Sequence, residues 1–232
     1  MIRPRPSQAT HPDWAFRVNP YTRWVHEHPE VLLARPTPAA LAQRLRAAGP
    51  PGAPLHVELG CGSGNVLLQL GAARPGVHFV GFELRYKRLV KAARKVERLG
   101  LTNVWFLREQ AENCFDYFPP GTVDTLAINF PDPWPKAVQW RKRLVGAPFL
   151  ERLHATLRPG GTLRLKTDHS GYFLHVLSLI RNRPEWRIRT FSNDLHRHGK
   201  RAGDAVSEFE QLFISKGRAV FCLVLEKAAA AP

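Results

Sequence analysis

From Leu55 onward, segments with strand character alternate with segments of helical periodicity. The clearest helical segment, residues 84–100, carries apolar side chains on one stripe and basic side chains opposite. Such alternation implies parallel strands joined by right-handed crossovers, which predicts an α/β fold with a doubly wound, mostly parallel, seven-stranded sheet. The predicted strands are 55–59, 77–83, 103–107, 125–130, 162–167, 185–191 and 218–226, and the predicted helices are 63–73, 84–100, 143–157 and 170–182.

The two ends of the chain depart from this alternation. No clear helix separates the last two strands, only a polar, basic loop over 193–207, so one of these strands is expected to be antiparallel. Residues 1–50 are rich in Pro and Arg, with a short helix predicted between Thr37 as N-cap and Gly49 as the stop. We therefore divide the chain into an N-terminal basic arm, 1–50, whose first 20 or so residues are expected to be poorly ordered, and an α/β domain, 51–232.

The charge of the chain suggests a polyanionic partner. Lys and Arg total 34 against 19 Asp and Glu, a net charge of +15 with a pI of about 10.6. Such a field favours nucleic acid, although a solubility-driven basic surface is the alternative. No apolar run has the roughly 18 residues of a membrane span, and no secretory signal is evident. Three well-separated cysteines indicate a reducing compartment, the cytoplasm, and no CxxC or HExxH spacing predicts a metal site.

A glycine-rich turn, "ELGCGSG", follows the first predicted strand of the domain. Its glycines allow a ligand to approach the backbone N–H groups closely, and a helix follows at once. The next strand ends at Glu83, 19 positions after the last glycine, where a carboxylate can accept both hydroxyls of a ribose. The context therefore predicts a nucleotide-type site that includes Glu58, Gly60, Gly62, Gly64 and Glu83.

The spacing and charge of this turn favour S-adenosylmethionine over a dinucleotide. A dinucleotide site requires G-x-G-x-x-G/A, and position 65 is Asn. Glu58 would suit a positively charged ligand, which S-adenosylmethionine is. After the third strand, Gln110 and Glu112 lie where an adenine edge is expected, although both residues equally suit the start of a helix.

The segment "NFPDPWPK", Asn129 to Lys136, follows the fourth strand and is expected at the carboxyl edge of the sheet, where ligands bind in this fold. Its three prolines forbid a regular helix or central strand, so Asp132 is fixed between Pro131 and Pro133. Amino-methylating enzymes carry an Asn/Asp-Pro-Pro-aromatic tetrad here, but in this chain an Asp separates the prolines. The alternative is a rigid turn with Trp134 packed in the core.

Taken together, "VELGCGSG", "GFE", "NFPDPWPK", "RKRLV", "LKTDH" and "SEFE" resemble the bacterial tRNA (guanine-N7-)-methyltransferase family of the TrmB type, over about residues 55–225. The resemblance implies a class I, Rossmann-like methyltransferase catalytic domain that uses S-adenosylmethionine, releases S-adenosylhomocysteine, needs no metal and binds tRNA as a monomer or homodimer. The implied cofactor-binding residues are Glu58, Gly60, Gly62, Gly64, Glu83, Gln110, Glu112 and Asp132. The implied substrate-binding residues are Lys136, Arg141, Lys142, Arg143, Asp168, Ser207, Glu208, Phe209 and Glu210.

The chain departs from the family pattern in three places. Gln110 stands where the family usually has Asp or Asn, and Ser207 stands where Thr is usual. After "PDPWPK" the family usually carries more basic residues, whereas this chain has "AVQW". We expect Trp140 of this segment to stack on a base.

The chemistry implied by the resemblance places Asp132 as the catalytic residue. Guanine N7 carries a lone pair and no proton, so methylation there requires in-line geometry and exclusion of water, with no base. A fixed carboxylate would stabilise the purine cation that develops, and would accept hydrogen bonds from guanine N1–H and the exocyclic amine.

Two other functions remain open from the residues alone. One is an amino-group methyltransferase acting on nucleic acid or protein, against which the Asp inserted between the prolines counts. The other is a catalytically silent RNA-binding module, against which the intact glycine turn and its acids count.

Overall fold

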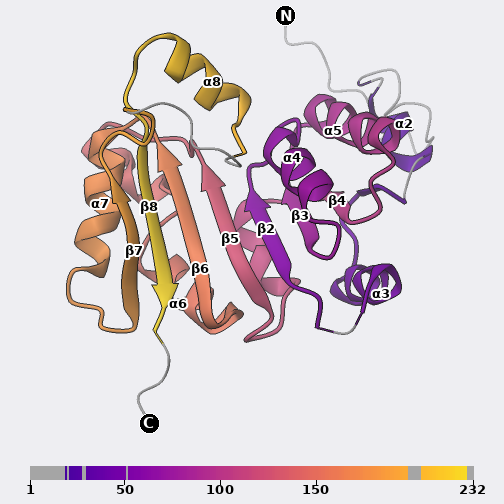
Figure 1. The fold of residues 1–232 in the computed structure, drawn as a ribbon, viewed down its shortest axis with the longest axis horizontal. Coiled ribbons are helices and arrows are strands. Elements are labelled where there is room, and N and C mark those ends of the chain that lie inside the picture. Colours follow the sequence, from indigo (N-terminus) through magenta and orange to yellow (C-terminus); the bar gives the residue numbers. More distant parts are fainter. Residues whose placement is uncertain (1–18, 20, 28–29, 51, 198–204, 229–232) are drawn as a thin grey trace, which may run out of the picture.

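In a computed structural model, the described residues are 19, 21–27, 30–50, 52–197 and 205–228, and they form one α/β layer structure (Figure 1). The expected disorder of the first 20 or so residues lies outside this part of the chain, apart from Asn19. None of the helices in the described ranges combines the length and apolar character needed to cross a bilayer.

Five neighbouring strands of the sheet are parallel. They are β4 (Val104–Leu107), β3 (His78–Phe82), β2 (Leu55–Leu59), β5 (Val123–Asn129) and β6 (Leu157–Thr167), in that spatial order. Every residue of β2, β3 and β4 is buried, as expected for parallel strands covered on both faces. The predicted doubly wound, mostly parallel fold is confirmed.

Over the described residues the sheet has eight strands, one more than predicted. The additional strand, β1 (Leu32–Leu33), pairs in parallel with β4 and extends one edge. At the other edge β8 (Phe221–Lys227) runs antiparallel to both β6 and β7 (Trp186–Ser192), which confirms the expected antiparallel strand.

The described part of the N-terminal segment packs on the domain through its apolar side chains. The predicted short helix is α3 (Pro38–Ala48), and the Thr37 hydroxyl accepts a hydrogen bond from the Ala40 N–H as its cap. Val25 of α2 (Tyr21–Glu27) and Leu41 of α3 are buried in the two main apolar clusters. The division of the chain at residue 50 stays a prediction.

Helices cover both faces of the sheet. α2, α4 (Asn65–Ala73) and α5 (Tyr86–Leu99) lie on one face, and the 3₁₀ helix η1 (Ala111–Asp116), α6 (Ala147–Thr156) and α7 (Ser170–Ile180) lie on the other. A short 3₁₀ helix, η2 (Ala137–Lys142), precedes α6.

The region between the last two strands contains a helix that was not predicted. α8 (Glu208–Ser215) lies beyond the carboxyl ends of the central strands (Figure 1). Ser207 and Glu210 form a capping box at its start, so "SEFE" held a helix signal. The described residues of the predicted loop 193–207 are not helical, but the expectation that no helix separates the last two strands is wrong, because this Ser-x-x-Glu pattern starts a helix directly after the loop.

Candidate active site

The register of the parallel strands aligns their carboxyl ends. Leu59 pairs with Phe82 and Ile128, and Phe82 pairs with Leu107, so the residues that follow lie along one edge. This edge carries the glycine turn, Glu83 and the proline-rich segment, as predicted from the ends of the strands.

The glycine turn has a backbone that other residues adopt only with strain. Gly60, Gly62 and Gly64 have φ values of 71°, 59° and 74°. At Gly64 a Cβ atom would lie 2.6 Å from the Phe106 ring, so this glycine also permits close packing of the turn on β4.

Glu58 is the most constrained acid at this edge. Its side chain is 2% exposed, and Oε1 accepts a hydrogen bond from the Asn129 Nδ2–H at 2.8 Å. Oε2 is buried and has no hydrogen-bond partner among the described residues. Burial raises the pKa of Glu58 to about 7, although the Asn129 hydrogen bond and the nearby Lys166 charge act in the opposite direction. A buried acceptor without a partner beside the glycine turn fits a cationic ligand group.

The second acid, Glu83, follows β3 and is held by its own backbone. Its Oε1 accepts hydrogen bonds from the N–H groups of Leu84 and Arg85, both at 2.9 Å. The carboxylate lines a cavity of about 470 Å³ that also includes Glu112 and Asp132. The structure thus brings together three acids that lie far apart in the sequence.

Of the two residues predicted after β4, Glu112 lines the cavity but Gln110 does not. Gln110 is exposed and does not line this cavity, whereas Glu109 does. The Glu109 carboxylate accepts hydrogen bonds from the Gln110 N–H, Asn113 and the Tyr117 hydroxyl. Partial burial acts to raise the pKa of Glu109, but these hydrogen bonds outweigh it and the net shift is downward. Its position just past the end of β4 was the signal that could have identified it.

The segment Asn129 to Lys136 combines prolines with a strained backbone. Phe130 and Trp134 have φ values of 54° and 42°, in the left-handed region that aromatic residues rarely adopt. Asp132, exposed to solvent, lies between them and lines the 470 Å³ cavity. Strain of this kind persists where the surrounding structure enforces it and is concentrated at functional sites.

The position of Trp134 decides between a residue of the ligand site and a residue packed in the core. It is half-buried, lines the cavity with Asp132 and carries the Lys142 ammonium 4.7 Å from its ring centre. It therefore forms part of the cavity wall and is not a residue of the core.

The buried side chain of Arg143 supports this segment from inside the protein. Its side chain is 6% exposed, and Nε donates to the Pro133 carbonyl at 3.0 Å. Its guanidinium also lies over the rings of Trp140 and Tyr172, at 4.7 and 5.2 Å. An RNA contact was expected of Arg143, but the side chain is turned into the protein, so we do not propose it as one. Lys136, Arg141 and Lys142 are exposed.

The start of α8 lies over the glycine turn. Glu208 accepts hydrogen bonds from the Ser63 hydroxyl at 2.7 Å and from Asn65 Nδ2 at 3.2 Å. Phe209 lies over the Arg88 guanidinium at 5.5 Å. A small cavity of about 70 Å³ remains between the turn and the helix, and Glu58, Asn129, Ser207 and Glu208 are among its lining residues.

Glu210 and Ser207 hold α8 in place. Glu210 is fully buried, and its carboxylate binds the Lys166 ammonium at 2.7 and 2.9 Å and His196 Nε2 at 2.8 Å. The Ser207 hydroxyl accepts from the Glu210 N–H as the helix cap. Both residues were expected to contact substrate. Glu210 is inaccessible, so we assign it a structural position and do not propose contact, whereas the contact of Ser207, which lines the 70 Å³ cavity, stays a prediction.

Asp168 follows β6, also at the carboxyl edge. Its carboxylate lies 3.3 Å from the Arg218 guanidinium. The sequence left open whether Asp168 caps the following helix, and the structure assigns the cap of α7 to His169, whose Nδ1 accepts from the Tyr172 N–H.

Residues that sequence reasoning missed here are Asn129, Arg88 and Glu109. Asn129 orients Glu58, and Arg88 lines both cavities. Asn129 stood at the head of the proline-rich segment and was given no role, because its partner lies 71 positions away in the chain.

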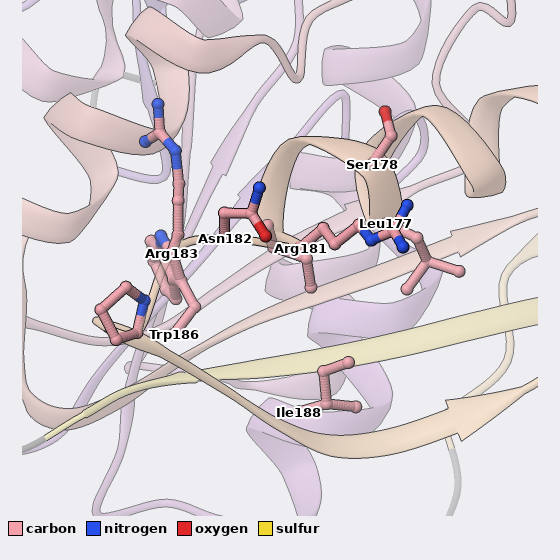
Figure 2. A pocket seen from close by; sticks show the side chains of 9 residues that line it. Leu177, Ser178, Arg181, Asn182, Arg183, Trp186 and Ile188 are labelled. Atoms are coloured by element: carbon pink, nitrogen blue, oxygen red, sulfur yellow. The ribbon is translucent and has the colours of Figure 1, made fainter.

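A wider cavity lies at the opposite edge of the sheet. Its volume is about 810 Å³, and Arg181, Asn182 and Arg183 line it beside the start of β7 (Figure 2). No carboxylate lines it, and none of the predicted site residues is near it. The carboxyl edge is therefore the candidate active site. No three His, Cys, Asp or Glu side chains in the described part of the chain are grouped so that they could hold a metal ion.

Comparison with known proteins gives one consistent family. The family model Methyltransf_4, described as "Putative methyltransferase", matches residues 52–223. A tRNA (guanine-N(7)-)-methyltransferase of Lachnoclostridium phytofermentans is 33% identical over 74% of this chain and 79% of its own. One of Limosilactobacillus fermentum is 30% identical over 92% and 95%, respectively.

Two further matches are to one part of a longer protein and to a solved structure of low sequence identity. A bifunctional glycosyltransferase/methyltransferase of Fusobacterium nucleatum is 37% identical over 70% of this chain, but the match spans only 25% of that longer protein. The crystal structure of the 16S rRNA methyltransferase KamB aligns with a TM-score of 0.60 at 15% identity, covering 82% of this chain and 94% of the other. At this identity the similarity establishes the fold alone.

Proposed function

Because this chain belongs to the bacterial tRNA (guanine-N7-)-methyltransferase family, we propose that it methylates N7 of a guanine in the variable loop of tRNA with S-adenosylmethionine as donor. The family resemblance and the methyltransferase class expected from the sequence are confirmed by these matches. The observation that carries the reaction is Asp132, fixed between two strained residues on the wall of a cavity shared with Glu83.

The donor would be held by Glu58, Glu83 and the glycine turn. The unpartnered Oε2 of Glu58 suits the donor ammonium, and Glu83 suits the ribose hydroxyls. Glu112 and the newly recognised Glu109 line the same cavity and suit the adenine edge, whereas exposed Gln110 is the weaker candidate. When bound, S-adenosylmethionine supplies a methyl group on a positively charged sulfur.

The acceptor would be held by Asp132. Its carboxylate can accept from guanine N1–H and the exocyclic amine, which selects guanine over adenine, and can stabilise the purine cation that methylation creates. No proton needs to leave N7, so the site requires no general base, and positioning by a rigid segment is sufficient.

The rest of the tRNA would contact the exposed cations around the cavity. Lys136, Arg141 and Lys142 project from the segment that follows Asp132, with Trp140 46% exposed beside them. Arg143 lies over the Trp140 ring, and the His175 ring lies beside it with ring centres 6.1 Å apart, so the base would stack on the exposed remainder of the indole. Asp168, Ser207, Glu208 and Phe209 remain proposed contacts of the target nucleotide. A cytoplasmic location and a monomeric or dimeric state also remain predictions.

The raised pKa of Glu58 predicts that the affinity of the protein for S-adenosylmethionine depends on pH. In the free protein the carboxyl has a pKa of about 7, so it is largely protonated at pH 5.5 and largely ionised at pH 7.5. If the ionised form binds the ammonium, the Kd of S-adenosylmethionine should fall by roughly 20-fold between these pH values. Isothermal titration calorimetry would measure this change, and Glu58→Gln should bind weakly with a flat profile. A wild-type profile as flat as that of the variant would contradict the role of Glu58.

The same raised pKa has a consequence for stability. Ionisation of Glu58 is less favourable in the folded protein than in the unfolded chain. Its contribution to stability is therefore present below about pH 4.5 and is lost as the pH rises through about 7. Urea unfolding of wild type and Glu58→Gln across this window, without donor, should show that only wild type loses stability from this source.

The proposed function is tested by identifying the modified nucleoside. Purified protein is incubated with methyl-labelled S-adenosylmethionine and unmodified tRNA, which is then digested to nucleosides. We expect label in 7-methylguanosine, and its loss when the variable-loop guanine is replaced by adenine. Label in 6-methyladenosine would support an amino-group methyltransferase, and no label transfer would support a silent RNA-binding module.

A further inference from the structure

The outer face of α5 carries a continuous basic stripe, which we define as Lys87, Lys91, Arg94 and Arg98. All four side chains are exposed. At 100° per residue they fall within an arc of about 60°, and at 1.5 Å per residue they extend over about 16 Å. Neighbouring members are three or four residues apart, so they lie one turn from each other along the helix.

The basic stripe lacks the acids that accompany a surface selected for solubility alone. α5 has six basic residues and one acid, Glu97. In the described part of the chain no carboxylate forms an ion pair with Lys87, Lys91 or Arg98, whereas some of the surface arginines elsewhere, Arg152 and Arg189 among them, pair with an Asp or a Glu. The positive charge of the stripe is therefore available to an external anion.

The inner face of α5 makes the stripe rigid. Leu89, Val90, Ala93 and Val96 are buried against the sheet. Arg94 lies over the Trp24 ring of α2 at 5.5 Å, which supports the stripe from the side. A rigid row of cations loses less conformational entropy on binding a polyanion than cations on a loop.

The basic stripe begins at the candidate active site. α5 starts directly after Glu83, Leu84 and Arg85, all of which line the 470 Å³ cavity, and Arg88 on its first turn lines the cavity as well. Because α5 connects the carboxyl end of β3 to the start of the parallel strand β4, the helix leads away from the carboxyl edge across one face of the sheet. An anion bound along the stripe would therefore be continuous with a nucleotide held at Asp132.

We propose that the basic stripe of α5 binds the sugar–phosphate backbone of the tRNA next to the methylated nucleotide. Cations one helical turn apart match a chain of phosphates, and their contacts would position the RNA without reading its sequence. The identity of the RNA rests on the proposed function, but the stripe itself rests on the charge and placement of α5.

The test is a pair of charge-matched double variants. Lys91→Gln with Arg98→Gln removes two charges from the stripe, at positions that do not line the cavity. Arg181→Gln with Arg187→Gln removes two exposed charges at the opposite edge of the sheet, beside the cavity of Figure 2. Glutamine is a good helix former, so α5 should remain intact.

The stripe variant is expected to bind tRNA roughly tenfold more weakly near 0.15 M salt. Its slope of log K against log salt should become shallower by about 1.4–1.8, the loss of two phosphate contacts. KM for tRNA should rise accordingly, while kcat and the Kd of S-adenosylmethionine stay unchanged. The control variant should retain wild-type affinity and slope.

Equal losses in both variants would show a net-charge effect and would overturn the assignment of the stripe, as would unchanged binding by the stripe variant. The nucleoside analysis keeps this result separate from the proposed function. If wild type forms 7-methylguanosine but the stripe variant binds normally, only the stripe fails. If wild type forms no 7-methylguanosine, and the stripe variant binds tRNA weakly while the control variant binds it normally, the proposed function fails and the assignment of the stripe stands.

Discussion

Asp132→Asn is expected to lower kcat by about 10²–10³-fold while leaving the Kd of S-adenosylmethionine within a few-fold of wild type. Asparagine keeps the shape of the side chain and one acceptor oxygen, but it removes the negative charge. The loss would therefore report the stabilisation of the purine cation by a fixed charge. Single-turnover methylation of tRNA with saturating enzyme would measure the chemical step apart from binding.

The backbone around Asp132 is the reason to expect a large effect. A carboxylate on a flexible loop would have to reorganise as charge develops, whereas the backbone that carries this one is restrained by Pro131 and Pro133 and by the strained Phe130 and Trp134. Asp132→Glu, which keeps the charge and moves it by one methylene, should also lose activity, although less than Asp132→Asn.

A matched control is Asp116→Asn, since Asp116 is an exposed acid paired with Arg152 on the surface and does not line the cavity. It should retain wild-type kcat. If Asp132→Asn turned over as fast as Asp116→Asn, the charge-stabilising role of Asp132 would be untenable.

Glu210→Gln is expected to lower the free energy of unfolding by about 3–5 kcal/mol. Lys166 is 3% exposed on the side chain and Glu210 is 0% exposed, so the substitution leaves the Lys166 ammonium buried without its carboxylate. The His196 ring, 7% exposed, loses the same partner. Urea unfolding monitored by circular dichroism would measure the loss.

The same substitution should weaken binding of S-adenosylmethionine. α8 is held over the glycine turn by Glu210, and its cap Ser207 and first residue Glu208 line the 70 Å³ cavity there. Loss of the anchor should free the start of α8, so the Kd of the donor should rise in parallel with the loss of stability.

Two controls separate the buried pair from a general effect of losing charge. Lys166→Met combined with Glu210→Gln removes the unpaired charge and should recover most of the stability. Asp116→Asn breaks a surface pair and should cost at most about 1 kcal/mol. Should Glu210→Gln unfold at the same urea concentration as wild type, the contacts of Glu210 with Lys166 and His196 would contribute no net free energy to folding. Another contact would then have to hold α8.

Much of the candidate site could be predicted from the ends of the strands. Glu58, Glu83 and Asp132 each lie at or just after the end of a strand, and parallel strands bring these ends to one edge whatever the details of packing. Residues on irregular segments were less predictable. Gln110 and Glu109 are adjacent in the chain, and only the path of the backbone after β4 decides which of them lines the cavity.

The charged residues that changed role share one physical cause. Arg143 stands beside Arg141 and Lys142, and Glu210 stands beside Glu208, in runs that read as uniform surface charge. In the structure one member of each run is buried by partners distant in the sequence, the Gly171 carbonyl for Arg143 and Lys166 for Glu210. Burial of a charge depends on a partner at hydrogen-bond distance, and spacing along the chain does not reveal such a partner.

By itself, the sequence determined the alternation of strands and helices, the glycine turn and the acids that follow the strands, because these depend on local periodicity and backbone freedom. Only the tertiary structure decided that an eighth strand joins the sheet, that α8 closes over the glycine turn, and which cations remain free on the surface. These features depend on contacts between segments far apart in the chain, whose free energy no local pattern records.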